Sequence, residues 1–259
     1  MLEQYPIAAP QDRLHCIRSS LLAGIPHGMF CCGGGVSRPP FAGLNLSSTV
    51  GDSPVAVRRN RERVKQVLGI RHLASAIQVH GRRIALVATN TADQEYADTD
   101  ALITNQSGVG LLIQQADCQA VLLHDPQRKA IAAIHNGWRG SAANILAATV
   151  RALEENFRVH PADLRAVISP SLGPCCSEFL HYAEELPETL HRYQVKENYF
   201  DFWAISRRQL ADAGVRSEYI ETVGVCTVCN RNFFSYRRAM RQPESTGKTG
   251  RNGSVISLP

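Results

Sequence analysis

Three polar residues stand where apolar segments of the sequence end. His80 closes SAIQVH, Cys118 lies in QQADCQA between two apolar runs, and His135 follows AIAAI, just before Asn136-Gly137. Two imidazoles and a thiolate are ligands typical of a catalytic zinc site, which uses three protein ligands and leaves a fourth position open. Copper competes at such sites on affinity grounds. The spacing is too long for a zinc finger, so these ligands must converge from separate strands. A core cysteine and two ordinary hydrogen-bonded histidines are the alternative.

Four further cysteines form a second candidate group. GPCC contains Cys175 and Cys176, and CTVC contains Cys226 and Cys229; together they could supply four thiolates to a structural zinc ion. Adjacent cysteines point poorly toward one metal ion, however, and the sequence has no second CxxC. Ordinary buried thiols are therefore the expectation here.

Helices and short strands must position these residues. In GDSPVAVRRNRERVKQVLGI, Ser53 can cap a helix, Pro54 suits its first position and Gly69 ends it. Short runs rich in Val and Ile and bounded by turn residues predict strands, several of them buried on both faces. These strands are expected at 84–88, 109–113, 120–124, 130–134, 165–169, 219–225 and 254–258. Further helices are expected at 141–157, capped by Ser141, at 177–192, and at 201–213, closed by Gly214.

The mixture of strands and helices predicts an α/β fold, with a single domain whose central mixed sheet is flanked by helices. Residues 1–24 are expected to form a peripheral N-terminal extension, and residues 25–259 the domain itself. The length of 259 residues is sufficient for a substantial core.

Composition excludes several classes of partner. The 28 basic and 23 acidic residues leave a net charge of +5, but the basic residues are scattered, so no nucleic-acid partner is expected. No apolar run approaches the roughly 18 residues that a membrane span needs. Eight cysteines without an evident signal peptide indicate reduced thiols in the cytoplasm. The sequence does not determine the oligomeric state.

A series of motifs in one order carries a family resemblance. GGVSRPPFAGLNLSSTVGD, QVHG, ADTDALIT, ADC, HNGWRG, GPCC, FFSYRR and TGR closely resemble the laccase-domain (YfiH-like) family over residues 25–258. Members are described as purine nucleoside phosphorylases with adenosine deaminase activity, and also as multicopper polyphenol oxidases or peptidoglycan editing factors. The resemblance implies a YfiH-like α/β fold and a Zn²⁺ ion held by His80, Cys118 and His135. It also implies purine nucleosides (adenosine, inosine or guanosine type) and phosphate as substrates.

Two departures from the family pattern concern substrate binding. Asn136 replaces the small residue that commonly follows the motif histidine, and Cys31-Cys32 stands where many members have Thr-Arg. The three implied metal ligands are unchanged.

Deamination would use a zinc-bound water of lowered pKa to attack C6 of adenine, with a carboxylate moving protons. Asp117 and Asp100 are the candidate carboxylates. Because neighbours along a strand alternate sides, Asp117 could instead face away from the metal.

Phosphorolysis would need a bound phosphate. Arg139 is the main candidate, since guanidinium binds phosphate with two hydrogen bonds and a helix is expected to begin near Ser141. Arg237 is a weaker candidate, as is Arg238, and a surface arginine is the alternative for Arg139. Further substrate contacts are expected from Asn45, Gln78 and Asn136, and Trp138 could stack on a purine or anchor the core.

Other functions make different use of the same residues. A true laccase is excluded, because the chain's 9 histidines include no H-x-H pair. A cysteine hydrolase acting on peptidoglycan precursors would use Cys118 as nucleophile and His135 or His80 as base. A third alternative is a non-enzymatic, metal-stabilised partner domain.

Overall fold

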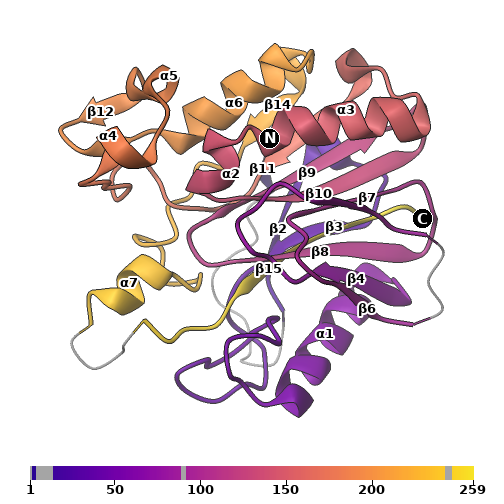
Figure 1. Cartoon of the computed structure of the whole chain (residues 1–259). Coiled ribbons are helices and arrows are strands. Elements are labelled where there is room, and N and C mark those ends of the chain that lie inside the picture. Colours follow the sequence, from indigo (N-terminus) through magenta and orange to yellow (C-terminus); the bar gives the residue numbers. More distant parts are fainter. Residues whose placement is uncertain (1, 4–13, 89–91, 243–246) are drawn as a thin grey trace.

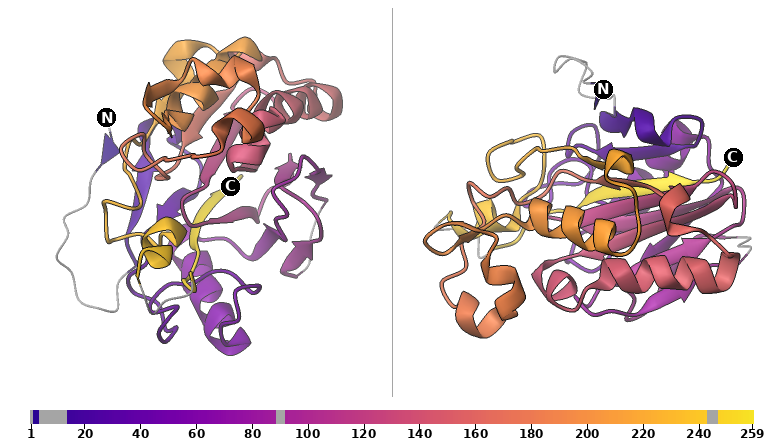
Figure 2. Two further views of the ribbon diagram at one scale, coloured as in Figure 1. Left: turned by 60° about the vertical axis from the view of Figure 1, so that its left-hand side comes forward. Right: turned by 90° about the horizontal axis from the view of Figure 1, so that it is seen from above.

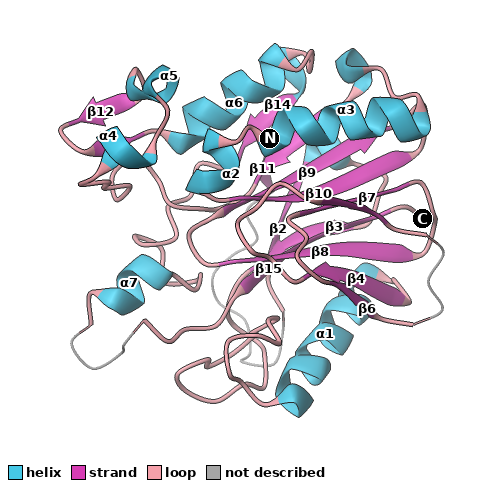
Figure 3. Ribbon diagram, viewed as in Figure 1, coloured by secondary structure: helices cyan, strands magenta, loops and turns pink. Residues whose placement is uncertain are grey.

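The computed structural model describes residues 2–3, 14–88, 92–242 and 247–259. Its strands form two mixed sheets that share one apolar core, and helices cover the outer faces (Figures 1 and 3). One sheet has seven described strands, in the order β1 (Leu2–Glu3), β2 (Cys16–Ser19), β3 (His27–Phe30), β15 (Asn252–Ser257), β8 (Val109–Gln115), β4 (His72–Ala76) and β6 (Gln94–Tyr96). The other has six, in the order β14 (Ile220–Thr222), β11 (Arg165–Ile168), β9 (Gln119–Asp125), β10 (Ala130–Asn136), β7 (Ala101–Thr104) and β5 (Ile84–Leu86).

The prediction of a mixed α/β fold is confirmed, but the single central sheet is wrong. Strand β10 shows the reason, because its apolar residues are buried on both faces. Ile131 and Ala133 pack into the core shared by the two sheets, whereas Ile134 packs under a helix. A continuous apolar run shows that both faces of a strand are covered. It does not show whether the cover is a helix or a second sheet.

Helix α1 (Pro54–Leu68) is confirmed with both of its predicted ends. The Ser53 side chain accepts a hydrogen bond from the Ala56 amide, and Gly69 ends the helix in the left-handed conformation at φ 67°. Val64 and Leu68 pack the helix against Leu73 and neighbouring residues on the outer face of the seven-stranded sheet.

The helix predicted at 141–157 is two helices, α2 (Trp138–Ala142) and α3 (Ile145–Phe157). Asn144 breaks the run at φ 52° and caps α3 by accepting a hydrogen bond from the Ala147 amide. Helix α3 lies beside α6 (Phe202–Asp212) over the six-stranded sheet (Figures 1 and 2).

The segment predicted as one helix at 177–192 contains α4 (Tyr182–Glu185) and α5 (Glu188–His191), which stand beside the hairpin of β12 (Gln194–Lys196) and β13 (Tyr199–Phe200). Helix α7 (Tyr236–Met240) follows the segment that contains Cys226 and Cys229.

Part of the range predicted as a peripheral extension belongs to the core. Strand β2 pairs with β3, and Leu22 in the following 3-10 turn (Ser20–Leu22) is fully buried. Residues 4–13 lie outside the described residues. None of the helices in the described ranges is long and apolar enough to cross a membrane.

Candidate metal centre and pocket

His80, Cys118 and His135 converge at the edge where the chain crosses between the two sheets. Cys118 lies between β8 of one sheet and β9 of the other, and His80 lies in the connection from β4 to β5, which also changes sheet. His135 stands near the end of β10. The Cys118 Sγ is 3.9 Å from the His80 Nε2, and the two imidazole rings are 4.8 Å apart at an interplanar angle of 78°. The ligand atoms of all three lie within 4.8 Å of one another, so the group could hold a metal ion.

Asp100, just before β7, organises two of these residues. Its fully buried carboxylate accepts hydrogen bonds from the amides of His80, at 3.0 Å, and Gly81, at 2.7 Å. Its Oδ1 also lies 2.7 Å from the Nδ1 of His135. These bonds lower the pKa of Asp100 although burial opposes ionisation. An ionised carboxylate can only accept, so His135 donates its Nδ1 proton to Asp100, and Nε2 is the nitrogen that could bind a metal on losing its proton, the usual arrangement of metal-ligating histidines.

Cys118 and His135 are electrostatically coupled. Burial opposes ionisation of both groups, yet the neighbouring His135 and His80 lower the pKa of Cys118 to about 6. The Cys118 charge and the Asp100 hydrogen bond raise the pKa of His135 to about 9. Thiolate is the form of cysteine that binds metals, so this environment fits a metal ligand.

The close packing around Gly137 explains why the HNGWRG motif has a glycine at this position. A Cβ at this position would lie 3.0 Å from the Cys118 Sγ and 3.1 Å from the His80 Cδ2. Any side chain here would therefore press on two of the three candidate ligands.

The three residues line a pocket of about 930 Å³. Its wall includes aromatic side chains from separate segments, namely Trp138, Phe179, Phe202 and Tyr236. Basic side chains, Arg237, Lys248 and Arg251, also line it. Its size and its mixture of apolar and convergent polar groups are typical of a small-molecule site.

The amides predicted to contact substrate are engaged within the protein. Gln78 lines the pocket, but its side chain pairs with both backbone groups of Gln114, at 2.7 and 2.9 Å. Asn136 is buried in the pocket lining, and its side-chain amide nitrogen donates to Gln119 and Ser206.

Asn45 is fully buried and does not line the pocket. It donates to Asp52 at 2.9 Å and accepts from the Arg251 amide at 2.9 Å. These bonds help to position the three side chains, because a buried polar group is stabilised by having its own partners, and their contact with substrate stays a prediction.

Asp117, next to Cys118 in the chain, lines the pocket and links this segment to Thr227 and Arg237. It adopts φ 86°, its Oδ1 accepts from the Thr227 hydroxyl at 2.7 Å, and its Oδ2 accepts from the Arg237 amide at 2.6 Å. Arg237 lines the pocket and donates from its guanidinium to the Glu178 carbonyl. Both predicted carboxylates, Asp117 and Asp100, thus hold protein groups in place. Glu178 and Glu185 also line the pocket.

Arg139 is exposed and is not among the pocket-lining residues. It lies inside α2 rather than ahead of a helix, and its guanidinium is 4.9 Å from the centre of the Trp138 ring. Trp138 both lines the pocket and packs against Phe179. The structure therefore corrects the expectation that Arg139 precedes the helix, and the role of Arg139 in phosphate binding stays a prediction.

Arg251 is the cation that sequence reasoning passed over, although the TGR motif contained it. It lines the pocket, and the charges of Cys118 and Asp117 act on it, while burial lowers its pKa. Phe179 and Tyr236 were also missed, because isolated aromatic residues carry no signal of a binding site until the fold brings them together.

Comparison with known proteins supports one family. The model of the family described as "Multi-copper polyphenol oxidoreductase laccase" matches residues 26–259. A purine nucleoside phosphorylase of Corynebacterium glutamicum is 32% identical over 234 residues, covering 87% of this chain and 91% of that protein. The crystal structure of YlmD from Geobacillus stearothermophilus has a TM-score of 0.84 at 29% identity, covering 96% of this chain and 98% of that one. The Bacillus licheniformis protein YfiH has a TM-score of 0.80 at 32% identity, covering 90% and 92%.

Proposed function

Because the chain belongs to the YfiH-like laccase-domain family of purine nucleoside phosphorylases, we propose that it cleaves purine nucleosides with phosphate and deaminates adenosine. The observation that carries the proposal is the convergence of His80, Cys118 and His135 at the pocket. Adenosine, inosine and guanosine are the proposed nucleosides.

The donor set fits zinc. Two imidazoles and one thiolate match a catalytic zinc site with three protein ligands, and the Asp100 contact at Nδ1 leaves Nε2 of His135 as the nitrogen for a metal. Copper would also bind such donors, but the chain's histidines do not form the paired clusters of a multicopper enzyme. A zinc ion held there would supply Lewis-acid activation of water or of a substrate group.

The protein's own residues supply binding and orientation. Phe179 and Tyr236 offer aromatic faces for a purine, and Arg251 and Arg237 offer guanidinium groups for phosphate. Both guanidinium groups also donate to backbone carbonyls, Arg251 to those of Thr249 and Gly250 and Arg237 to that of Glu178. Arg251 is the phosphate candidate that we favour, because it lies within the electrostatic reach of Cys118 at the metal centre. Asp100 positions His135 and the His80 loop.

Chromatography of adenosine incubated with the purified protein, with and without phosphate, tests the proposal. We expect phosphate-dependent release of adenine and phosphate-independent formation of inosine, both lost in His80→Ala. Folded, zinc-loaded protein that forms neither product would refute the proposal.

A cysteine hydrolase is the second candidate, and the low pKa of Cys118 favours it. In this reading Cys118 is the nucleophile and His135 the base, and the substrate is a peptide bond of a peptidoglycan precursor. Chelation separates the two functions, since a metal-free thiolate enzyme gains or keeps activity on muropeptides when zinc is removed. A non-enzymatic partner domain predicts that neither substrate class is turned over.

A further inference from the structure

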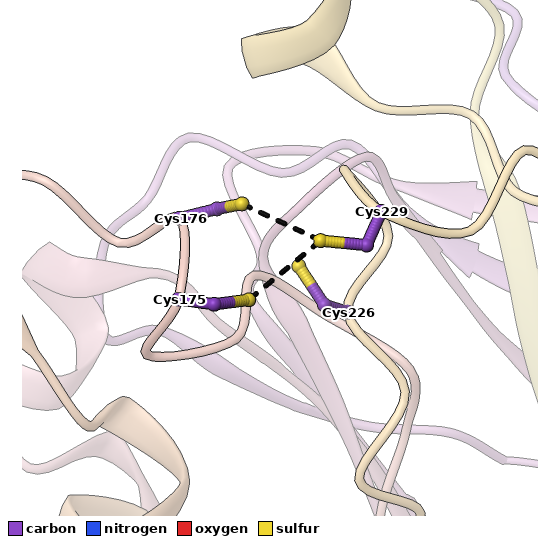
Figure 4. Close-up of side chains that lie close together, drawn as sticks. All are labelled: Cys175, Cys176, Cys226 and Cys229. Atoms are coloured by element: carbon purple, nitrogen blue, oxygen red, sulfur yellow. Dashed lines mark hydrogen bonds between the residues drawn. The ribbon is translucent and has the colours of Figure 1, made fainter.

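Four cysteines from two segments far apart in the sequence meet at one point (Figure 4). Cys175 and Cys176 lie in the loop after β11, and Cys226 and Cys229 lie in the loop after β14. The Cys229 sulfur is 3.7 Å from that of Cys175 and 3.6 Å from that of Cys176. All four sulfurs are within 4.8 Å of one another.

The expectation of ordinary buried thiols does not describe this group. Cys176 and Cys226 are buried, but Cys175 and Cys229 are exposed residues whose sulfurs still turn inward toward the other two (Figure 4). Adjacent cysteines were expected to point poorly toward one metal ion. In the structure they lie in a turn, in which the Cys176 amide donates to the Gly173 carbonyl at 2.9 Å. Both neighbouring side chains thereby reach the same point.

Two of the sulfur–sulfur distances match a tetrahedral thiolate site. Zinc–sulfur bonds of about 2.3 Å place the ligand sulfurs about 3.8 Å apart at the corners of a tetrahedron. The distances from Cys229 to Cys175 and Cys176 are close to this value. Four thiolates in tetrahedral geometry are characteristic of structural zinc, with iron as the competitor.

The backbone is arranged to support negative charge on sulfur. The Gly173 amide donates to the Cys226 sulfur at 3.4 Å, across the two segments. A Cβ on Gly173 would lie 3.0 Å from the Cys226 Cβ and 2.9 Å from the Trp203 ring, so this close approach requires glycine.

Arg238 stabilises the loop that contains Cys226 and Cys229. Its guanidinium donates to the carbonyls of Thr227, Val228, Asn230 and Phe233, which enclose the turn that carries Cys229. The same two segments pair through backbone hydrogen bonds between Ser171 and both Val225 and Thr227. Arg238 thus supports the loop that carries Cys229.

We propose that Cys175, Cys176, Cys226 and Cys229 bind a structural zinc ion that is separate from the metal held by His80, Cys118 and His135. This ion joins the two segments that continue into the pocket wall, one through Phe179 and the other through Tyr236 and Arg237. Asp117 links both segments to Cys118, because its carbonyl accepts from the Leu172 amide and its carboxylate from Thr227 and Arg237. The inference does not depend on the proposed enzymatic activity.

Elemental analysis of the purified full-length chain tests the inference. We expect about two zinc ions per chain in the wild type, and about one in each of Cys229→Ser and His80→Ala. The double variant should hold none. Cys16→Ser, which removes a half-buried thiol of β2 outside both groups, is the matched control and should keep both ions.

A second measurement keeps the inference testable if Cys229→Ser fails to fold. Wild-type protein reconstituted with Co²⁺ should show the intense visible bands of tetrahedral cobalt bound by four thiolates, and His80→Ala should retain them. Alkylation followed by mass spectrometry should find the four cysteines protected together until a chelator is added. A single zinc lost entirely in His80→Ala, disulfides among the four cysteines, or one iron in place of the second zinc would each overturn the assignment.

Discussion

The Oδ1 of Asp100 lies 2.7 Å from the Nδ1 of His135, and both side chains are buried. The same carboxylate accepts the amide of His80, so one residue orients two of the three candidate ligands. Replacing an orienting carboxylate of this kind costs roughly 10- to 100-fold in metal affinity. We expect Asp100→Asn to weaken zinc binding by about that factor, measured by competition with a chromophoric chelator. A melting curve separates this effect from unfolding, and unchanged affinity would show that Asp100 does not act through His135.

Gly137→Ala should disturb the metal centre through steric contact alone. The added methyl group would meet the Cys118 sulfur and the His80 ring at 3.0 and 3.1 Å. Displacement of the ligands by a fraction of an ångström should lower nucleoside turnover by up to about 100-fold. Gly33→Ala is the matched control, because nothing lies within 4 Å of a Cβ there. Equal activity in the two variants would contradict the close packing of Gly137 against the ligands.

The Cys118 thiol should be reactive only after metal removal. Its pKa of about 6 lies below neutral pH, so metal-free Cys118 is mainly thiolate at about pH 7 and mainly thiol at about pH 5. The rate of alkylation by iodoacetamide in chelated protein should therefore fall about tenfold between these values. Burial raises the pKa of Cys16, which makes it the slow internal control. Equal rates of Cys118 alkylation with and without zinc would count against a metal-bound thiolate.

The KM for phosphate should distinguish the roles of Arg251 and Arg139. Arg251→Gln removes a pocket guanidinium and should raise the KM for phosphate by roughly 10- to 100-fold, the usual effect of losing a charge-assisted hydrogen bond. Arg139→Ala changes an exposed residue outside the pocket lining and should leave that KM within about twofold. The reverse result would return Arg139 to the phosphate role expected from the sequence.

The elements predicted correctly were those with local signals. Ser53, Pro54 and Gly69 define both ends of helix α1, and capping is a short-range interaction. The division between α2 and α3 was missed, because Ser141 looks like a cap in isolation. In the fold Asn144 takes that role at a left-handed backbone position.

The sequence by itself determined the types of the ligands and the apolar runs that end beside them, since ligand chemistry and strand burial are properties of the residues. Only the tertiary structure decided which partners within the protein the polar groups have. Asn45, Gln78 and Asn136 resemble substrate contacts in sequence, yet each is held by partners within the protein. The tertiary structure also decided that Cys229 meets Cys175, because the strands that bring the two loops together, β11 and β14, are distant in the chain and pair only in the folded sheet.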